Sequence, residues 1–369
     1  MSFEGAVLPD YAGRSLANLL PSVGAHLGLG HTDVLGLPDA RAYLVLMVDG
    51  FGWRQLQEHV STAEFLGATS SGPVTCGVPS TTATSLTSLG TGRPPGAHGM
   101  VGYRFRNPAS GEVMNALSWE NGPDDVATLQ PHPTIYSALP GESAAIALAR
   151  FNNSGLTRAS LAGATMIPVI EEDDHAARID QAVEATRGNR LVYCYERLLD
   201  HTGHTHGVGS WQWLDRLAAV DDLAAELRAT LDDDVCILVT GDHGMVNTVP
   251  GHTLVIEDEP DLGGFDELAG EARFRHLYTD RPTWLAARYA EALGDRAWVF
   301  TREEGIEAGL FGTVAPRVLP SLGDVMVAMR EDWVLMTRTH PVEMTLAGVH
   351  GSLTAEEMLV PLITLPGRP

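Results

Sequence analysis

Short apolar runs that stop abruptly on an acidic residue or a glycine recur along the chain. The clearest run, Tyr43–Val48, is followed directly by Asp49 and Gly50. Uninterrupted apolar runs of this length are typical of strands buried on both faces of a parallel sheet. The same pattern predicts strands at Ala144–Ala149, Leu191–Tyr195 and Val235–Thr240, and a terminal strand after the sequence GVHGSLTAEEM.

Helical periodicity alternates with these predicted strands. An amphipathic helix is predicted over residues 211–231 from three- and four-residue spacings between Leu214, Leu217, Val220, Leu223 and Leu227. A second helix is predicted after the hydroxyl-rich stretch PSTTATSLTSLGTG, because Ser80, Thr81 and Thr82 are favourable N-cap residues. The alternation predicts an α/β fold with a mostly parallel central sheet and helices on both faces.

The regular alternation is lost between residues 250 and 345. This range is rich in Gly, Pro and charged residues, and its clearest strands are the short Trp298–Phe300 and Val334–Met336. A chain of this length also exceeds the size at which one core usually suffices. We therefore expect a catalytic domain of residues 1–249 plus 346–369, with residues 250–345 inserted as a smaller subdomain packed on it.

Charge narrows the class of partner. The chain has 369 residues, with 24 Lys or Arg and 47 Asp or Glu, so its formal net charge is −23. Such a surface repels nucleic acid polymers and anionic membranes. A small anionic substrate could still bind if metal ions offset the local charge.

The sequence shows no sign of a disulfide framework, a signal peptide or a membrane span. The three cysteines are too few and too scattered for a disulfide framework. The N-terminus lacks the basic and apolar regions of a signal peptide, and no apolar run approaches the ~18 residues that cross a bilayer. We expect a cytoplasmic protein without a membrane partner, and the sequence leaves the oligomeric state open.

Metal-binding side chains follow three predicted strands and recur in the C-terminal loop. Carboxyl ends of parallel strands share one edge of a sheet, which is where ligands bind in open α/β folds. Asp and neutral His are suitable zinc ligands, and carboxylates also bind Mn²⁺ or Mg²⁺. The number of residues fits two metal sites with three protein ligands each: Asp49, Asp200, His204, Asp242, His243 and His350.

Each of these short motifs has a plainer interpretation when taken alone. Asp49 could cap the following turn, and an Asp-His pair is often a surface pair. Among the other histidines, His201 and His206 are expected to lie outside the ligand set or in solvent. His98 and His252 are expected to structure their loops. Only the joint pattern of acids at several strand ends favours a metal centre.

Five motifs, in this order, resemble the alkaline phosphatase superfamily. They are VDGFG, PSTTATSLTSLGTGRPPGAHGM, DHTGHTHG, TGDHGM and GVHGSLTAEEM, and they extend from Asp49 to His350. The branch they resemble most is the nucleotide pyrophosphatase/phosphodiesterase family. The resemblance implies an alkaline-phosphatase-like fold and a two-zinc phosphohydrolase with a threonine nucleophile.

The resemblance also implies a role for each ligand. One metal would be held by Asp49, Asp242, His243 and the nucleophile. The other would be held by three residues, Asp200, His204 and His350. Zn²⁺ is the expected ion at both sites, with Mn²⁺ or Mg²⁺ as alternatives.

The family pattern places the nucleophile at Thr82, two residues after Ser80 and nine before Thr91. Thr81 is the second candidate. A free hydroxyl is a poor nucleophile near neutral pH, and both a metal ion and a helix N-terminus would favour its alkoxide. The alternative is that these hydroxyl groups only cap the helix.

One position departs from the family. Nucleotide pyrophosphatases usually follow the nucleophile with Phe-Pro-Asn, whereas this chain has Ala83-Thr84-Ser85. Ser85 would take the place of the Asn that holds a phosphate oxygen, with one weaker hydrogen bond. The aromatic contact to a base is missing, which bears on nucleotide specificity more than on the reaction class.

The expected function is therefore cleavage of phosphodiester or pyrophosphate bonds in small, nucleotide-like substrates through a phosphothreonine. Monoester cleavage needs an additional cation, and Arg93 and Arg104 are as readily surface residues as site residues. A phosphomonoesterase, phosphonate hydrolase or phosphomutase of the same superfamily stays an alternative, as does a metal-binding protein without catalysis. A sulfatase is disfavoured because no Arg follows Cys76-Gly77-Val78-Pro79 in the required frame.

Overall fold

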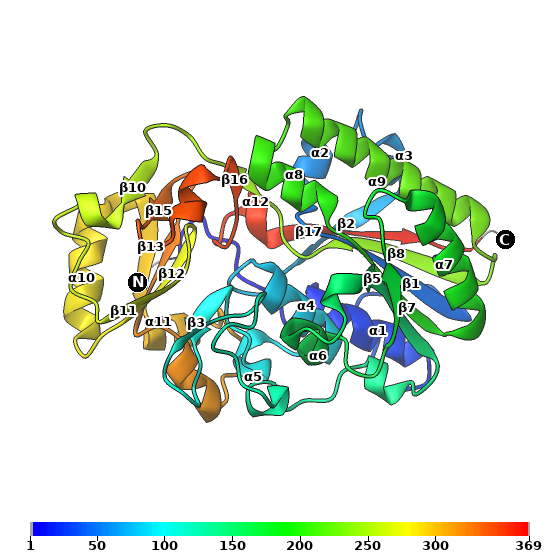
Figure 1. Ribbon diagram of the computed structural model, residues 1–369, viewed down its shortest axis with the longest axis horizontal. Coiled ribbons are helices and arrows are strands. Elements are labelled where there is room, and N and C mark those ends of the chain that lie inside the picture. Colours follow the sequence, from blue (N-terminus) through cyan, green and yellow to red (C-terminus); the bar gives the residue numbers. More distant parts are fainter. Residues whose placement is uncertain (1–2, 368–369) are drawn as a thin grey trace.

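A seven-stranded sheet forms the centre of the computed structural model, which describes residues 3–367 (Figure 1). Its spatial order is β2 (Ser70–Thr75), β17 (Leu359–Leu365), β8 (Val235–Gly241), β1 (Ala42–Val48), β7 (Leu191–Glu196), β5 (Ser143–Leu148) and β6 (Thr165–Val169). Strands β8, β1, β7, β5 and β6 pair in parallel, whereas β17 is antiparallel to both of its neighbours. The predicted mostly parallel α/β sheet is confirmed.

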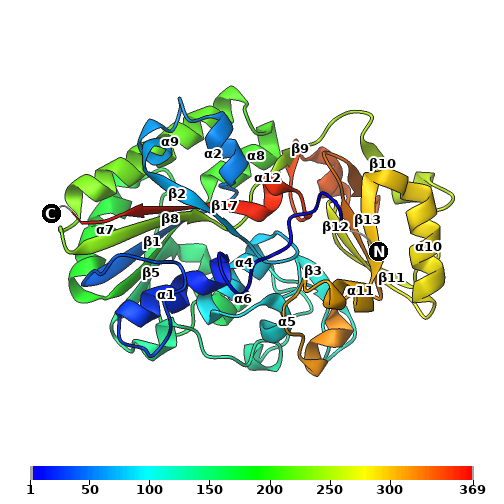
Figure 2. The same ribbon diagram turned by 180° about the vertical axis from the view of Figure 1, so that it is seen from behind.

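Helices cover both faces of this sheet (Figures 1 and 2). One face carries α1 (Leu19–His26), α4 (Thr82–Thr91) and α6 (Gly155–Ser160), and the other carries α2 (Trp53–Glu58), α3 (Glu64–Thr69), α7 (His175–Gly188) and α9 (Trp211–Thr230). The alternation of side chains along β1 explains why both faces need cover. Tyr43, Val45 and Met47 enter the first core, and Leu44, Leu46 and Val48 enter the second. All seven residues of β1 are buried.

A second sheet of four antiparallel strands lies beside the first (Figure 1). Its order is β11 (Glu267–Glu271), β12 (Phe274–Tyr278), β14 (Val325–Met329) and β13 (Ala297–Thr301). Helix α10 (Pro282–Leu293) packs on one face, where it shares a core with Val325 and Val327. On the other face Met326 and Ala328 join the core of the first sheet. This sheet falls within residues 250–345, and the division of the chain into two domains stays a prediction, with residues 1, 2, 368 and 369 outside the described part.

Shorter elements complete the fold. They are α5 (Pro95–His98), β3 (Arg104–Arg106), β4 (Val113–Asn115), α8 (Leu198–His206), β9 (Val246–Asn247), β10 (Thr253–Val255), α11 (Arg302–Glu307), β15 (Val334–Met336), β16 (Gly348–Val349) and α12 (Ala355–Met358). A fully buried ion pair fixes α12 to the second sheet, with Arg273 Nε 3.0 Å and Nη2 2.6 Å from the two carboxylate oxygens of Glu357. Within residues 3–367 no helix combines the length and apolar character needed to cross a bilayer.

A buried histidine on β12 should make stability depend on pH. His276 Nδ1 accepts a hydrogen bond from Gly323 N, and Nε2 donates to Val101 O, each at 3.0 Å, so the imidazole is neutral. Burial lowers the pKa of His276 to about 4. Its stabilising contribution is complete above about pH 6.5, the usual pKa of an unfolded histidine, and is lost as the pH falls toward 4.

We therefore expect the free energy of unfolding to fall by about 1.4 kcal/mol per pH unit across this window because of His276. The matched variant is His276→Gln, which keeps an amide donor and acceptor but does not titrate. Urea unfolding at several pH values should show a shallower dependence in the variant. Equal slopes in the two proteins would contradict this assignment.

Candidate active site

The adjacent strands β8, β1 and β7 present their carboxyl ends at one edge of the central sheet. The register pairs Val48 with Glu196 on one side and with Gly241 on the other, so the three strands end level with one another. Asp49 and Asp242 follow β1 and β8 directly, and Asp200 lies on α8, which follows β7. The sequence-based expectation that these acids share one edge therefore agrees with their positions.

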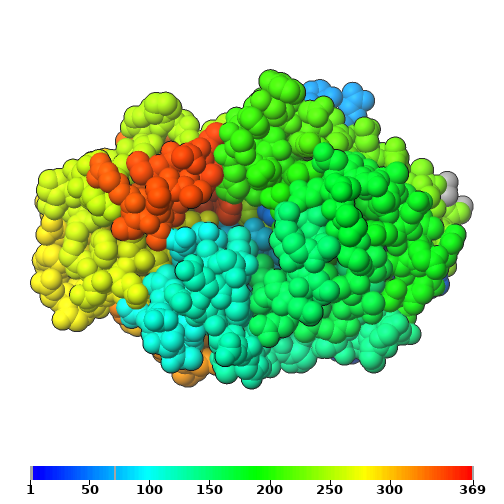
Figure 3. Space-filling view, in the orientation of Figure 1, coloured from blue at the N-terminus to red at the C-terminus, as the bar shows by residue number. Residues whose placement is uncertain are grey.

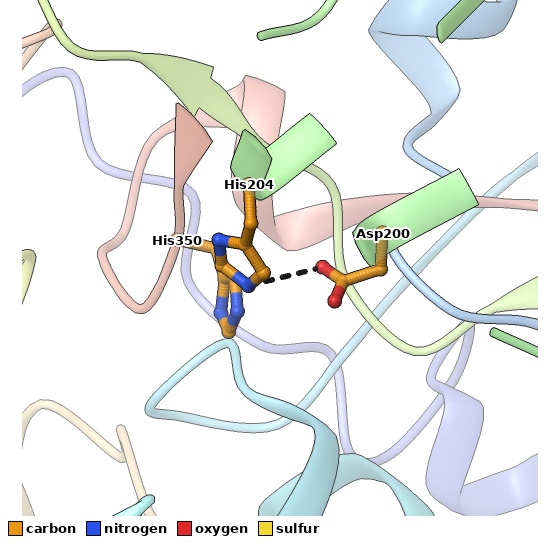
Figure 4. Close-up of side chains that lie close together, drawn as sticks. All are labelled: Asp200, His204 and His350. Carbon is orange, nitrogen blue, oxygen red and sulfur yellow. Dashed lines mark ion pairs between the residues drawn. The ribbon is translucent and has the colours of Figure 1, made fainter. Parts of the chain in front are cut away.

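Asp200, His204 and His350 form one candidate metal-binding group (Figure 4). A ligand atom from each lies within 4.8 Å of the others. His204 Nε2 is 3.4 Å from Asp200 Oδ1, as expected for residues one helical turn apart on α8. His350 reaches the same point from the loop after β16.

A second candidate group contains Asp49, Asp200 and His243, again with ligand atoms within 4.8 Å of one another. Asp242 adjoins it, with Oδ2 3.6 Å from His243 Nε2. The rings of His243 and His350 stack with centroids 3.6 Å apart, so the two groups are contiguous. The carboxylate of Asp200 therefore lies near both groups, whereas the sequence assigned it to one.

The histidines of both groups are oriented in the same way. Nδ1 of His204, His243 and His350 lies 2.7, 2.9 and 3.0 Å from the carbonyl oxygens of Gly348, Gly244 and Ser80, respectively. A carbonyl only accepts hydrogen bonds, so each Nδ1 carries the hydrogen and each neutral ring keeps its lone pair on Nε2. Metal-binding histidines are held in this way.

The electrostatics of the edge favour a bound cation. Asp200 Oδ1 and Asp242 Oδ2 are buried without a hydrogen-bond partner among the described residues. Burial, followed by the charges of Asp242 and Asp200, raises the pKa of Asp49 well above its usual range. Burial, followed by His243 and His204, lowers the pKa of His350, which favours the neutral ligand form. Clustered carboxylates with neutral imidazoles are a donor set that fits divalent ions such as Zn²⁺.

Thr82 faces this edge from the first turn of α4. Its Oγ1 lies 3.2 Å from His243 Nε2 and 3.4 Å from Asp49 Oδ1. Thr81 is the N-cap residue, but its side chain makes no capping hydrogen bond and lies near Glu271. Of the two candidate threonines, Thr82 is therefore the one whose hydroxyl lies beside Asp49 and His243, and it does not serve as the helix cap.

The remaining predicted residues have different surroundings. Ser85 is fully buried beside the Cys76 thiol and does not line the cavity, so its expected contact with a phosphate oxygen has no support in the structure. Ser85 lies one turn further along α4 than Thr82, where it is enclosed by the protein and does not reach the cavity. His98 is buried and bonds Ser88 Oγ at 2.9 Å, and His252 pairs with Asp332 at 2.5 Å. His201 lines the cavity outside both candidate groups.

A cavity of about 550 Å³ opens at the candidate site. Its lining includes Asp49, Thr82, Asp200, His204 and His350. Figure 3 shows the hollow between the cyan surface of β3 and β4, the orange-red segment before β16 and the green surface of α8. Its wall includes several residues that the sequence did not single out: Tyr103, Phe151, Tyr193, Tyr195, Glu271 and His340. Nothing in the sequence spacing of these residues marks them as part of a site, because they belong to strands, loops and one short 3-10 helix whose sequence patterns reflect burial.

Tyr195 is the residue of this wall that contacts a candidate metal ligand most directly. Its hydroxyl donates a hydrogen bond to Asp49 Oδ2 and so fixes the orientation of that carboxylate. Such supporting hydrogen bonds typically contribute 10- to 100-fold to metal affinity or activity. We expect Tyr195→Phe to weaken zinc binding by at least about tenfold, measured by chelator competition.

The neighbouring Tyr193 supplies the control. It stacks on Tyr195 at 6.1 Å, and its buried hydroxyl has no hydrogen-bond partner among residues 3–367. Tyr193→Phe should therefore leave zinc affinity nearly unchanged. Equal losses in the two variants would show that packing, rather than the hydrogen bond to Asp49, is responsible.

Comparisons with known proteins bear on the family and the fold of the chain. The sequence model of the type I phosphodiesterase/nucleotide pyrophosphatase family matches residues 43–353. No match was found among curated proteins.

Solved structures with a similar fold include an inactive variant of murine ectonucleotide pyrophosphatase/phosphodiesterase 5 in complex with AMP, with 19% sequence identity, 87% of each chain covered and a TM-score of 0.69. The human protein of the same name has 16% sequence identity with this chain, 88% of each chain covered and a TM-score of 0.68. Phosphonoacetate hydrolase from Sinorhizobium meliloti 1021, in complex with phosphonoformate, gives 20% identity, with 90% of this chain and 92% of that chain covered and a TM-score of 0.65.

Proposed function

Because the chain belongs to the type I phosphodiesterase/nucleotide pyrophosphatase family, we propose that it is a metal-dependent phosphohydrolase that forms a phosphothreonine intermediate. Its substrates are small, nucleotide-like phosphodiesters or pyrophosphates. The observation that carries the proposal is the position of Thr82 Oγ1, within 3.4 Å of both Asp49 and His243 at the start of α4. The inactive murine relative carries a threonine-to-alanine substitution, which is in keeping with a threonine nucleophile.

Two divalent ions, most suitably Zn²⁺, would be held by Asp49, Asp242, His243 and Thr82 and by Asp200, His204 and His350. When bound, they would lower the pKa of the attacking hydroxyl and neutralise charge on the phosphoryl group and leaving oxygen. Asp200, which lies near both candidate groups, would hold the two sites close together.

The residues of the chain perform the remaining steps. Thr82 Oγ1 gives up its proton to solvent and attacks phosphorus in line, so that the Oγ–P bond forms, the bond from phosphorus to the leaving oxygen breaks, and the leaving oxygen takes up a proton from solvent. The free N–H groups in the first turn of α4 donate hydrogen bonds to the phosphoryl oxygens. A water molecule then cleaves the Oγ–P bond and restores the Thr82 hydroxyl. Two in-line displacements retain configuration at phosphorus.

The test combines metal analysis of the purified protein with three chromogenic esters. We expect bound divalent metal, and faster hydrolysis of bis-p-nitrophenyl phosphate and of a nucleotide p-nitrophenyl ester than of p-nitrophenyl phosphate. Activity toward the monoester alone would favour a phosphomonoesterase and contradict the proposal. With a chiral phosphorothioate substrate, inversion at phosphorus would exclude the covalent intermediate.

A further inference from the structure

Arg104 stands apart from the other arginines in the cavity wall. It lies on β3, and its guanidinium packs over the ring of Tyr103 with 5.4 Å to the centroid. Arg150 and Arg197, the two others in the wall, both form ion pairs with Glu172, at 2.5 and 2.9 Å. No carboxylate among residues 3–367 lies within ion-pair distance of Arg104, so its charge is not neutralised by the described chain.

His340 positions this guanidinium. Arg104 Nη1 donates a hydrogen bond to His340 Nδ1 at 2.5 Å, and both residues line the cavity. Because Nδ1 accepts, the ring keeps its hydrogen on Nε2 and stays neutral. The bond uses one N–H of the five that a guanidinium carries, which leaves further donors for a ligand. The two residues come from segments more than two hundred positions apart, so the tertiary fold creates the arrangement.

Acidic residues are abundant in this chain, with 47 Asp or Glu against 24 Lys or Arg. Arg296 and Arg317 also lack a carboxylate partner, but they donate to backbone carbonyl groups, whereas the hydrogen bond of Arg104 within the described residues is to His340. The guanidinium geometry of Arg104 matches the paired oxygens of a carboxylate or phosphoryl group. Neither Arg104 nor His340 forms a hydrogen bond or ion pair with Thr82 or with the candidate metal ligands, although all of them line or adjoin the same cavity.

We propose that Arg104, held by His340, binds a second anionic group of the substrate, a carboxylate or a phosphoryl group carried on the organic substituent away from the reacting phosphorus. This inference rests on the proposed function, because it assumes that the reacting phosphoryl group lies at Thr82. It assigns Arg104 to substrate specificity and gives this end of the cavity a substrate class. Esters with a single negative charge would leave Arg104 without a partner.

A series of inhibitors tests this assignment. Alkylphosphonates of increasing length are compared with ω-carboxyalkylphosphonates and α,ω-bisphosphonates of the same lengths, as competitive inhibitors of bis-p-nitrophenyl phosphate hydrolysis. At one length, the terminal anion should strengthen inhibition by at least about tenfold, the contribution of a charge-assisted hydrogen bond. The carboxylate and bisphosphonate series show which of the two anions Arg104 prefers.

Variants connect the effect to the residue. Arg104→Gln should remove the gain from the terminal anion while the alkylphosphonates inhibit as before, and Arg104→Lys should keep part of the gain. The matched control is Arg187→Gln, an exposed arginine on α7 that does not line the cavity. It should keep the full gain.

Two outcomes would overturn the assignment: no gain at any length in the natural protein, or a gain that survives in Arg104→Gln. Failure of the proposed function is distinguishable, because the natural protein would then not hydrolyse the diester. In that case the same series is measured by calorimetric binding, where loss of the gain in Arg104→Gln still supports the anion site and an unchanged gain contradicts it.

Discussion

Thr82→Ala is expected to lower kcat for phosphodiester hydrolysis by at least about a thousandfold, while the bound metal content stays unchanged. Thr82 Oγ1 is the hydroxyl that faces both Asp49 and His243, and the backbone of α4 starts at this residue. Removing the hydroxyl removes the covalent route. It also removes one of the four groups that would hold one metal ion, but the carboxylates and imidazoles, which are the stronger ligands, are retained. Steady-state kinetics with bis-p-nitrophenyl phosphate, together with metal analysis of the same preparation, measure both parts of the prediction.

Two further variants distinguish chemistry from helix capping. Thr82→Ser keeps a hydroxyl and should recover much of the activity. Thr81→Ala changes the N-cap residue, whose side chain makes no capping hydrogen bond, and should cost far less activity than Thr82→Ala. If Thr81→Ala abolished turnover and Thr82→Ala did not, the two roles would have to be exchanged. If neither mattered, water would be the attacking group.

The gathering of acidic residues at one edge of the sheet could be predicted from sequence, because it follows from local patterns along the chain. An apolar run ending on Asp49 predicts a buried strand, and parallel strands bring Asp49 and Asp242 to one edge without further information. The four-residue spacing of Asp200 and His204 places them on one side of a helix. The structure shows all three relationships.

Other features depend on contacts between distant segments, which no local pattern specifies. Tyr195 reads as one more residue of a buried strand, yet its hydroxyl holds Asp49. Ser85 lies near Thr82 in sequence, but it is fully buried and does not line the cavity. Arg104 could not be assigned from sequence, because its place in the cavity wall depends on how β3 packs near residue 340.

The four-stranded sheet illustrates the same limit. Its strands are short, and their apolar residues are shared between two cores, with Val325 and Val327 on one face and Met326 on the other. Strand pairing in an antiparallel sheet is decided by register and turns that a single sequence specifies weakly. The sequence therefore predicted an irregular insertion with two short strands, where the structure has a complete sheet covered by α10.

Removal of divalent metal is expected to lower activity by at least about a thousandfold and to destabilise the protein, with both effects reversed by adding Zn²⁺. The carboxylates of Asp49, Asp200 and Asp242 are buried close together, and without a cation they repel one another. Dialysis against a chelator followed by thermal unfolding and kinetics measures both effects. His350→Ala should lose about one equivalent of metal, because His350 belongs to one of the two candidate groups.

The destabilisation should also grow with pH, and this distinguishes a metal held by the carboxylates from one bound elsewhere. The pKa of Asp49 in the metal-free folded protein is raised above its unfolded value, so the protonated form is favoured. Its contribution to stability is present at low pH and is lost as the pH rises from about 4 through the raised pKa. A bound cation prefers the ionised carboxylate, so the metal-loaded protein escapes this loss. The difference in Tm between metal-loaded and chelated protein should therefore be larger near pH 8 than near pH 5. Asp49→Asn should make this difference less dependent on pH. A difference that is independent of pH in the natural protein would contradict metal binding by this carboxylate.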